Sequence, residues 1–292
     1  MIHVLALVGV VSISFSAIFV RLASVSPVTA TFYRAAYALP VLAAVWAMRR
    51  AGDRRTRAAR WLAIVSGLIL GFELNFWHES IGLIGAGLGT VLANVQVVFV
   101  ALAGWMLYGE RPTGRTVATI GAVLVGVALM SGLARHDAYG SNPAAGVAFG
   151  IVAGIGYAAF LMVFRAANRS LAPVSGPLLD STIGMAAGAL LCATFDTGFA
   201  IVPTWPAHLW LVLLALCSQV IGWLLISTAL PRLPAVETSI ILLVQPVFAL
   251  LWSVLVFAER LSAMQWTGSA LVLGGVATLS TGRAVTRSNA AL

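Results

Sequence analysis

Long apolar runs alternate with short polar connections along the whole chain. A helix needs about 20 apolar residues to cross the hydrocarbon core of a bilayer, and ten runs reach or nearly reach this length. We therefore predict an all-α integral membrane protein with ten transmembrane helices. They are expected at 2–23, 28–48, 61–80, 84–107, 115–132, 144–165, 175–196, 207–229, 235–257 and 262–282.

Two stretches in different halves of the chain are similar to each other. Residues 96–111 read QVVFVALAGWMLYGER, and residues 245–260 read QPVFALLWSVLVFAER. At an offset of 149 residues, six of the sixteen positions are identical, including a Gln at the start and a Glu-Arg pair at the end. Similarity at a fixed offset predicts an internal repeat. We place five helices in residues 1–142 and five in residues 143–292.

Composition and charge agree with a membrane protein. Hydrophobic residues make up 61% of the chain, charged residues 9%, and the mean hydropathy is +1.01, which excludes a soluble globular protein. All 17 basic residues are Arg, and they lie mainly between apolar runs, so the net charge of +8 orients helices in a bilayer and does not indicate nucleic-acid binding.

The arginines also predict the orientation. If the N-terminus is cytoplasmic, 13 arginines lie in cytoplasmic connections and three lie outside. The positive-inside rule then places both termini in the cytoplasm of a bacterial inner membrane. Five helices per repeat is an odd number, so the second repeat is inverted, and Glu110 and Glu259 lie on opposite faces. Inverted repeats are typical of secondary transporters.

Several motifs carry a family resemblance. They are Ser14-Phe15-Ser16, Pro27, Phe32-Tyr33-Arg34 and the two repeated stretches. With these motifs the chain resembles the drug/metabolite transporter superfamily, and within it the EamA-type exporters with two five-helix repeats. The resemblance is greatest to bacterial amino-acid exporters, including the aromatic type. One departure is Val97, where the second stretch has Pro246 and a kink is expected.

The third predicted helix holds the best candidates for substrate binding. Glu73, Trp77 and Ser80 share one face at helical spacing, and His78 lies on a neighbouring face. An ionisable group inside a membrane is costly and therefore a functional candidate. Glu73 suits an ammonium group and Trp77 suits a ring or a cation. His78 is a candidate proton carrier. The alternative for the mechanism is movement of the substrate without proton coupling, and the alternative for His78 is a place near the outer end of the helix among the lipid headgroups.

Other helices supply further candidates for the substrate site. The serine, aromatic and amide side chains of interest are Ser16, Asn94, Gln96, Tyr157, Gln219 and Trp223. Uncharged amides in membrane helices either bond across helices or bind a substrate. The glycines at 146, 150 and 154 indicate a close packing face.

A second group of residues is interpreted as structural or as part of gating. Arg34 is expected to have a structural partner or to reach the outer surface, in preference to contact with the substrate, and Asp180 lies at a comparable place in the second repeat. The prolines in helices, Pro40 and Pro246, are candidate bending points. Glu110 and Glu259 are interpreted as hairpin corners.

Two hydroxyl residues follow these corners. Thr113 comes after Glu110, and Ser262 comes after Glu259. Each stands just before an apolar run, where a hydroxyl is well placed to cap the N-terminus of a helix.

The sequence therefore predicts a secondary transporter in the lipid bilayer. It would export small metabolites, chiefly amino acids, by alternating access through a cavity between the repeats. Alternatives are a facilitative or uptake carrier for another metabolite or drug, a channel, and a membrane-embedded enzyme, for which no catalytic motif is present. Cys192 and Cys217 lack metal-type spacing and no P-loop occurs, so we expect no cofactor or metal.

Overall fold

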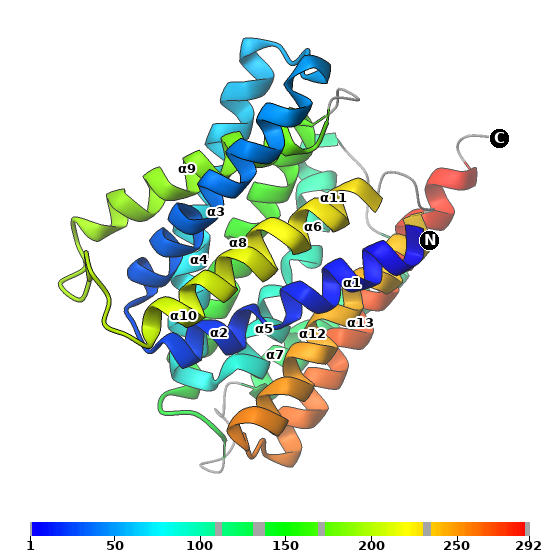
Figure 1. Cartoon of the computed structure of the whole chain (residues 1–292). Helices are drawn as coiled ribbons and strands as arrows, with labels where there is room; N and C mark the ends of the chain where they lie inside the picture. Colours follow the sequence, from blue (N-terminus) through cyan, green and yellow to red (C-terminus); the bar gives the residue numbers. More distant parts are fainter. Residues whose placement is uncertain (1, 109–112, 131–137, 169–172, 230–234, 290–292) are drawn as a thin grey trace.

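The computed structural model describes residues 2–108, 113–130, 138–168, 173–229 and 235–289, and this part of the chain is helical without a β-strand (Figure 1). The elements are α1 (Ile2–Ser14), α2 (Ser16–Ala23), α3 (Pro27–Arg49), η1 (Arg50–Gly52), α4 (Arg57–Ile84), α5 (Ala86–Ala93), α6 (Gln96–Tyr108), α7 (Gly114–Met130), α8 (Pro143–Ala167), α9 (Ser175–Ala193), α10 (Ala207–Leu213), η2 (Leu214–Gly222), α11 (Trp223–Ala229), α12 (Ala235–Phe257) and α13 (Ala263–Asn289).

Six of the expected spans are confirmed as helical stretches that are long and apolar enough to cross a membrane. They are Ile2–Ala23, Pro27–Gly52, Arg57–Ile84, Pro143–Ala167, Ser175–Ala193 and Ala207–Ala229. Three shorter apolar helices lie at 86–100, 114–130 and 244–257. The protein is therefore an all-helical, multi-pass membrane protein.

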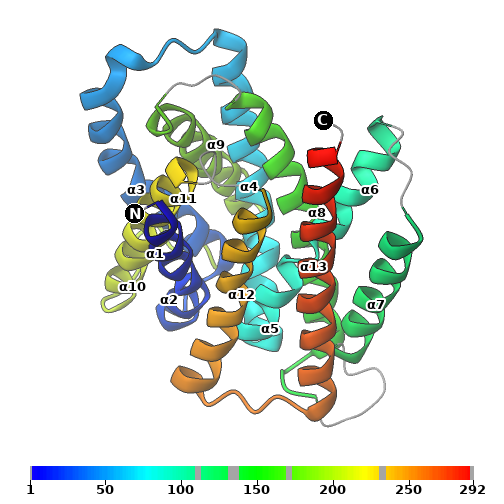
Figure 2. The ribbon, with the colours of Figure 1, turned by 90° about the vertical axis from the view of Figure 1, so that its right-hand side faces the viewer.

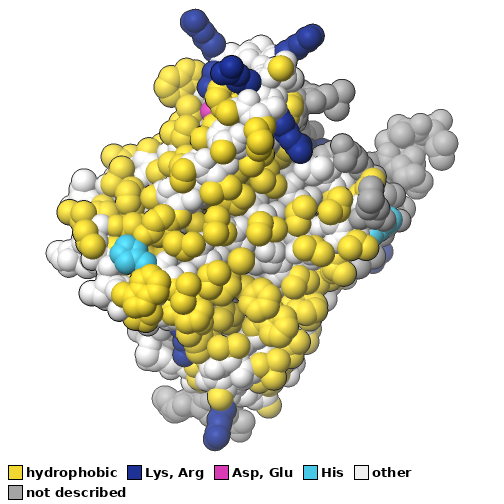
Figure 3. Space-filling view, viewed as in Figure 1, with side chains coloured by type: hydrophobic (Ala, Val, Ile, Leu, Met, Phe, Trp, Pro, Cys, Tyr) yellow, Lys and Arg dark blue, Asp and Glu magenta, His cyan; other side chains and the backbone are white. Residues whose placement is uncertain are grey.

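The surface has the polarity that a bilayer requires. Apolar side chains cover the middle of the face in Figure 3, and the arginine side chains stand at its upper and lower ends. Large side chains such as Phe72, Phe76 and Leu124 are exposed along the helices. A water-soluble protein rarely exposes so continuous an apolar surface, so these side chains face lipid.

Glycines bring the central helices into close contact. A Cβ atom on Gly67 of α4 would lie 1.7 Å from the carbonyl oxygen of Ser181 on α9. A Cβ atom on Gly146 of α8 would lie 2.4 Å from the side chain of Ile84 at the end of α4. Cβ atoms on Gly150 and Gly154 would lie 2.8 Å from the Cβ of Leu92 and 3.3 Å from the backbone nitrogen of Gln96. The prediction that the glycines at 146, 150 and 154 form a close packing face is confirmed. On the other side of the molecule α13 runs beside α7 and α12 (Figure 2).

Two of the predicted helices are broken. The first divides at Phe15, next to Ser14, whose hydroxyl donates to the carbonyl of Val11 (2.6 Å). The run at 84–107 divides after Asn94, whose amide donates to the carbonyl of Thr90 (2.9 Å). These side chains bond to carbonyl groups of the preceding turn, which competes with regular helix geometry. The first expected span therefore stays one apolar stretch, Ile2–Ala23, with an interruption at Phe15, whereas the run at 84–107 is divided among the end of α4, α5 and α6.

The helix at 207–229 is continuous but changes its winding. Residues Leu214–Gly222 form a π-helical segment, η2, between α10 and α11. Such segments are rare and are frequent at functional sites. This segment contains Gln219, one of the candidate binding residues.

A buried cavity as candidate substrate site

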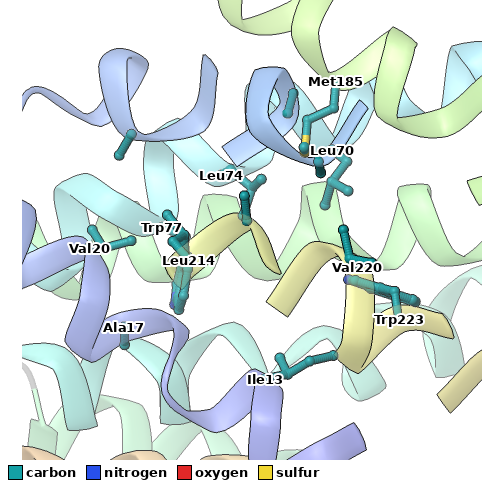
Figure 4. Packing of buried hydrophobic residues seen from close by; sticks show 14 of the residues in the cluster. Ile13, Ala17, Val20, Leu70, Leu74, Trp77, Met185, Leu214, Val220 and Trp223 are labelled. Atoms are coloured by element: carbon teal, nitrogen blue, oxygen red, sulfur yellow. The ribbon is translucent and has the colours of Figure 1, made fainter. Parts of the chain in front are cut away.

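A cavity with several polar side chains in a mostly apolar lining lies among helices from both halves of the chain. Its lining residues are Ile13, Ser16, Arg34, Leu70, Glu73, Leu74, Trp77, Thr90, Ala93, Asn94, Tyr157, Trp223 and Gln245. Figure 4 shows Ile13, Leu70, Leu74 and Trp223 among the apolar side chains of this part of the core. The expected first, third, fourth, sixth, eighth and ninth helices contribute, and α3 adds Arg34.

One oxygen of the Glu73 carboxyl group lacks a hydrogen-bond partner among the described residues, and Arg34 acts on this group electrostatically without forming an ion pair with it. Glu73 is 4% exposed, and its Oε2 atom has no hydrogen-bond partner among the described residues. Nε1 of Trp77, one turn further along α4, also has no hydrogen-bond partner among the described residues. Gly156 of α8 makes room for the carboxylate, because a Cβ atom there would lie 2.9 Å from the Cβ of Glu73. Buried polar atoms are normally bonded, so these two point to a ligand.

Arg34 is the cation of the cavity and is held by hydrogen bonds. Its Nε donates to Oε1 of Gln219 (3.0 Å), and one terminal nitrogen donates to the hydroxyl of Ser16 (3.1 Å). The other end of the Gln219 amide donates to Oγ1 of Thr182 on α9 (3.0 Å). Among the described residues no ion pair joins Arg34 to Glu73. The cavity therefore contains one buried cation and one buried anion that do not neutralise each other in direct contact.

Aromatic side chains form one wall. Tyr157 of α8 stacks on Phe160 with ring centroids 5.8 Å apart. Trp223 of α11 meets the same Phe160 edge to face at 5.5 Å. Because these rings support each other, Tyr157 and Trp223 present firm apolar surfaces to the cavity.

The structure brings most of the predicted binding residues together. Lining positions are held by Ser16, Glu73, Trp77, Asn94, Tyr157 and Trp223. Gln219 lies behind Arg34 and holds it. Two predicted residues are elsewhere: Nδ1 of His78 bonds to Thr31 (3.2 Å) beside the start of α3, and Gln96 is not in the lining. His78 lies on a different face of α4 from Glu73. That face packs against α3, so the imidazole bonds to Thr31.

The residues interpreted as structural or gating also have definite places. Arg34 has structural partners, Gln219 and Ser16, and it also lines the cavity. Pro40 lies exposed within an unbroken α3, and Pro246 is buried in α12 beside Gln245. Glu259 pairs with Arg21.

Two further acidic residues were considered. Asp180 does not line the cavity and pairs with Arg55 (2.9 Å) and Arg60 (3.4 Å). Glu110 lies outside the described residues, so its role as a hairpin corner stays a prediction.

Sequence reasoning missed six lining residues. They are the apolar Ile13, Leu70 and Leu74, and also Thr90, Ala93 and Gln245. Thr90 and Ala93 carry no distinguishing signal in an apolar helix. Gln245 did have one, because it begins the second copy of the repeated stretch and precedes a proline inside a helix.

A multi-pass helical fold around a cavity with polar side chains is an arrangement that membrane transport proteins use. Residues 1–132 and 144–281 match the EamA-like transporter family. Because these matches cover most of the chain, the protein belongs to this family, which is a family of transporters and not of enzymes. The resemblance to EamA proteins is thereby confirmed.

Two known proteins are similar to this chain. An uncharacterized transporter of Archaeoglobus fulgidus is 26% identical over 198 residues, which span 63% of this chain and 68% of the relative. A solved crystal structure covers 98% of both chains with a TM-score of 0.65 at 19% identity. At this identity the second likeness shows the fold alone.

Proposed function

We propose that this protein is a secondary exporter of small metabolites, with amino acids as the expected class of substrate. It would work by alternating access between two inverted repeats of five helices each, with both termini in the cytoplasm of a bacterial inner membrane. The observation that carries the proposal is the cavity, in which the buried carboxylate of Glu73 lacks a bonding partner.

The position of the cavity supports a carrier. Its walls come from both proposed repeats, with Glu73 in the first and Trp223 and Gln245 in the second. The breaks at Phe15 and Asn94 adjoin it. Transporters of this kind bind substrate between repeats, where helices are discontinuous. The two separate matches to one family support a repeat.

Uncoupled movement is the simpler mechanism for the residues present. The candidate proton carrier His78 bonds to Thr31 and to the carbonyl of Pro27 (3.1 Å) and does not line the cavity. Direction would then follow the concentration gradient of the substrate, so the alternative of a facilitative or uptake carrier uses the same site.

Flux measurements in proteoliposomes test this proposal. We expect saturable movement of at least one amino acid in a panel of neutral and aromatic ones, without dependence on an imposed pH gradient. Empty liposomes are the control. Absence of saturable flux across the panel would contradict the amino-acid class, non-saturating flux would favour a channel, and flux that follows the pH gradient would favour proton coupling.

A further inference from the structure

We infer that the cavity binds a small zwitterion, with its carboxylate on Arg34 and its ammonium group on Glu73. This inference rests on the proposed function and names the substrate class of the same site. Among α-amino acids it selects those with a small side chain.

Glu73 is suited to an ammonium group. It is a buried acid on the cavity wall, with one oxygen that no described residue bonds. Its neighbours on α4, Leu70, Leu74 and Trp77, carry no charge, and Arg34 acts on it without direct contact. A carboxylate in such surroundings is stabilised by a ligand that brings both a positive charge and N–H donors.

Arg34 is suited to a carboxylate. Gln219 and Ser16 bond two of its three guanidinium nitrogens, and no bond is formed by the third in the described part of the structure. Gln219 presents its oxygen to Arg34 because its nitrogen donates to Thr182. The guanidinium is thus fixed by neutral groups and keeps its charge and one terminal nitrogen for the ligand.

The two charges together disfavour simpler ions. Arg34 and Glu73 attract each other across the cavity without direct contact. A ligand with one charge would neutralise one of them and leave the other without its opposite charge. An unpaired charge in a buried site is strongly unfavourable. A ligand that carries both charges satisfies both residues. The site therefore selects a zwitterion, because a cation or an anion alone would leave one buried charge unpaired.

The size of the cavity limits the side chain of the ligand. Its volume is about 50 Å³, counted as the space open to the centre of a water molecule. One water needs roughly 10–15 Å³ by this measure, so the space suits glycine, alanine or serine and not an indole ring. The indole of Trp223 and the phenol of Tyr157 are part of the wall and limit the space for a large side chain.

Binding to protein in lipid nanodiscs tests the pairing of charges. The probes are L-alanine, L-alaninamide, which lacks the carboxylate, and N-acetyl-L-alanine, which lacks the ammonium group. We expect each derivative to bind at least about tenfold more weakly than alanine, a difference of about 1.4 kcal/mol. In Glu73→Gln the preference for alanine over N-acetylalanine should collapse, whereas the preference over alaninamide should persist.

Variants on the other side of the cavity give the reciprocal result. Arg34→Gln should abolish the preference for alanine over alaninamide. If this variant does not fold, Ser16→Ala removes one bond to Arg34 without orphaning a charge and should reduce that preference several-fold. Glu79→Gln is the matched control, because Glu79 is exposed on the same helix as Glu73 and should leave every ratio unchanged.

The size limit has its own test in proteoliposomes. Wild-type flux of alanine should exceed that of tryptophan at least about tenfold, and Trp223→Ala should narrow this ratio. Trp61→Ala, an exposed tryptophan of α4, is the control. Equal flux of tryptophan and alanine in the wild type would overturn the size limit.

The outcomes separate this inference from the proposed function. If amino acids are carried but alaninamide or N-acetylalanine binds as well as alanine, the paired-charge site is refuted and the exporter stands. If no amino acid binds or moves, the proposed function fails with it.

Discussion

The ion pair of Arg21 and Glu259 predicts an unequal response to the removal of its two members. The Glu259 side chain is fully buried, and its Oε1 accepts a hydrogen bond from the backbone N–H of Ala86 (2.9 Å) at the start of α5. Arg21 is 33% exposed and also donates to the hydroxyl of Tyr139 (3.1 Å). The pair joins the end of α2 to the corner after α12.

The expected magnitudes follow from this difference in burial. Arg21→Gln leaves the buried carboxylate without a cation, which costs 3–5 kcal/mol in a fully buried pair. Because Arg21 is one-third exposed, water screens part of the interaction, and we expect about 2–3 kcal/mol. Glu259→Gln removes the buried charge and keeps an oxygen for Ala86, so it should cost only about 1 kcal/mol.

Unfolding in mixed micelles with a rising fraction of SDS, followed by circular dichroism, measures these free energies. The double variant should be about as stable as Glu259→Gln alone, because that variant has already removed the charge that Arg21 balances. Glu79→Gln, an exposed acid, is the control and should change stability by less than about 0.5 kcal/mol. Equal single costs that simply add in the double variant would refute this account of the corner.

Three further predictions concern stability. Gly67→Ala should prevent folding or lower the free energy of unfolding by more than about 3 kcal/mol, because the new Cβ would meet a carbonyl oxygen of α9. Gly82→Ala on the same helix is the control. Its Cβ meets nothing within 4 Å, so this variant should raise the free energy of unfolding by about 0.5–1 kcal/mol in the same assay. Hydrogen bonds from Arg55 lower the pKa of Asp53 well below its ordinary value of about 3.9. Its stabilising effect is therefore present above about pH 4 and lost as the pH falls through the folded pKa, and Asp53→Asn should flatten the acid limb of a plot of unfolding temperature against pH. Ser262→Ala should cost about 1 kcal/mol through loss of a helix cap, measured by unfolding with SDS.

Features fixed by neighbouring residues could be predicted from the sequence. Thr113 and Ser262 were expected to cap the next helices, and their hydroxyls accept from the backbone N–H groups of Thr116 and Gln265, each at 3.2 Å. Helical periodicity also placed Glu73 on one face of its helix. These features depend on spacings of three to seven residues, which the sequence shows directly.

The role of Arg34 could not be predicted in this way. Its bond to Gln219 joins residues 185 positions apart, and the orientation of that amide depends on Thr182 of a third helix. No local pattern contains this geometry. For the same reason periodicity showed that His78 lies on another face than Glu73 but not that α3 covers that face.

The helix breaks show how the site and the motion of a carrier can share residues. Prolines suggested bending points, yet α3 continues through Pro40, while breaks occur at Phe15 and Asn94, where no proline stands. In lipid, irregular backbone is tolerated only where protein or a polar cavity satisfies it. The residues beside these breaks, Ser16 and Asn94, line the cavity. Under the proposed function, a ligand in the cavity would lie beside the two points where the helices are interrupted, and we therefore propose that occupancy of the cavity and the angle between helix segments are coupled.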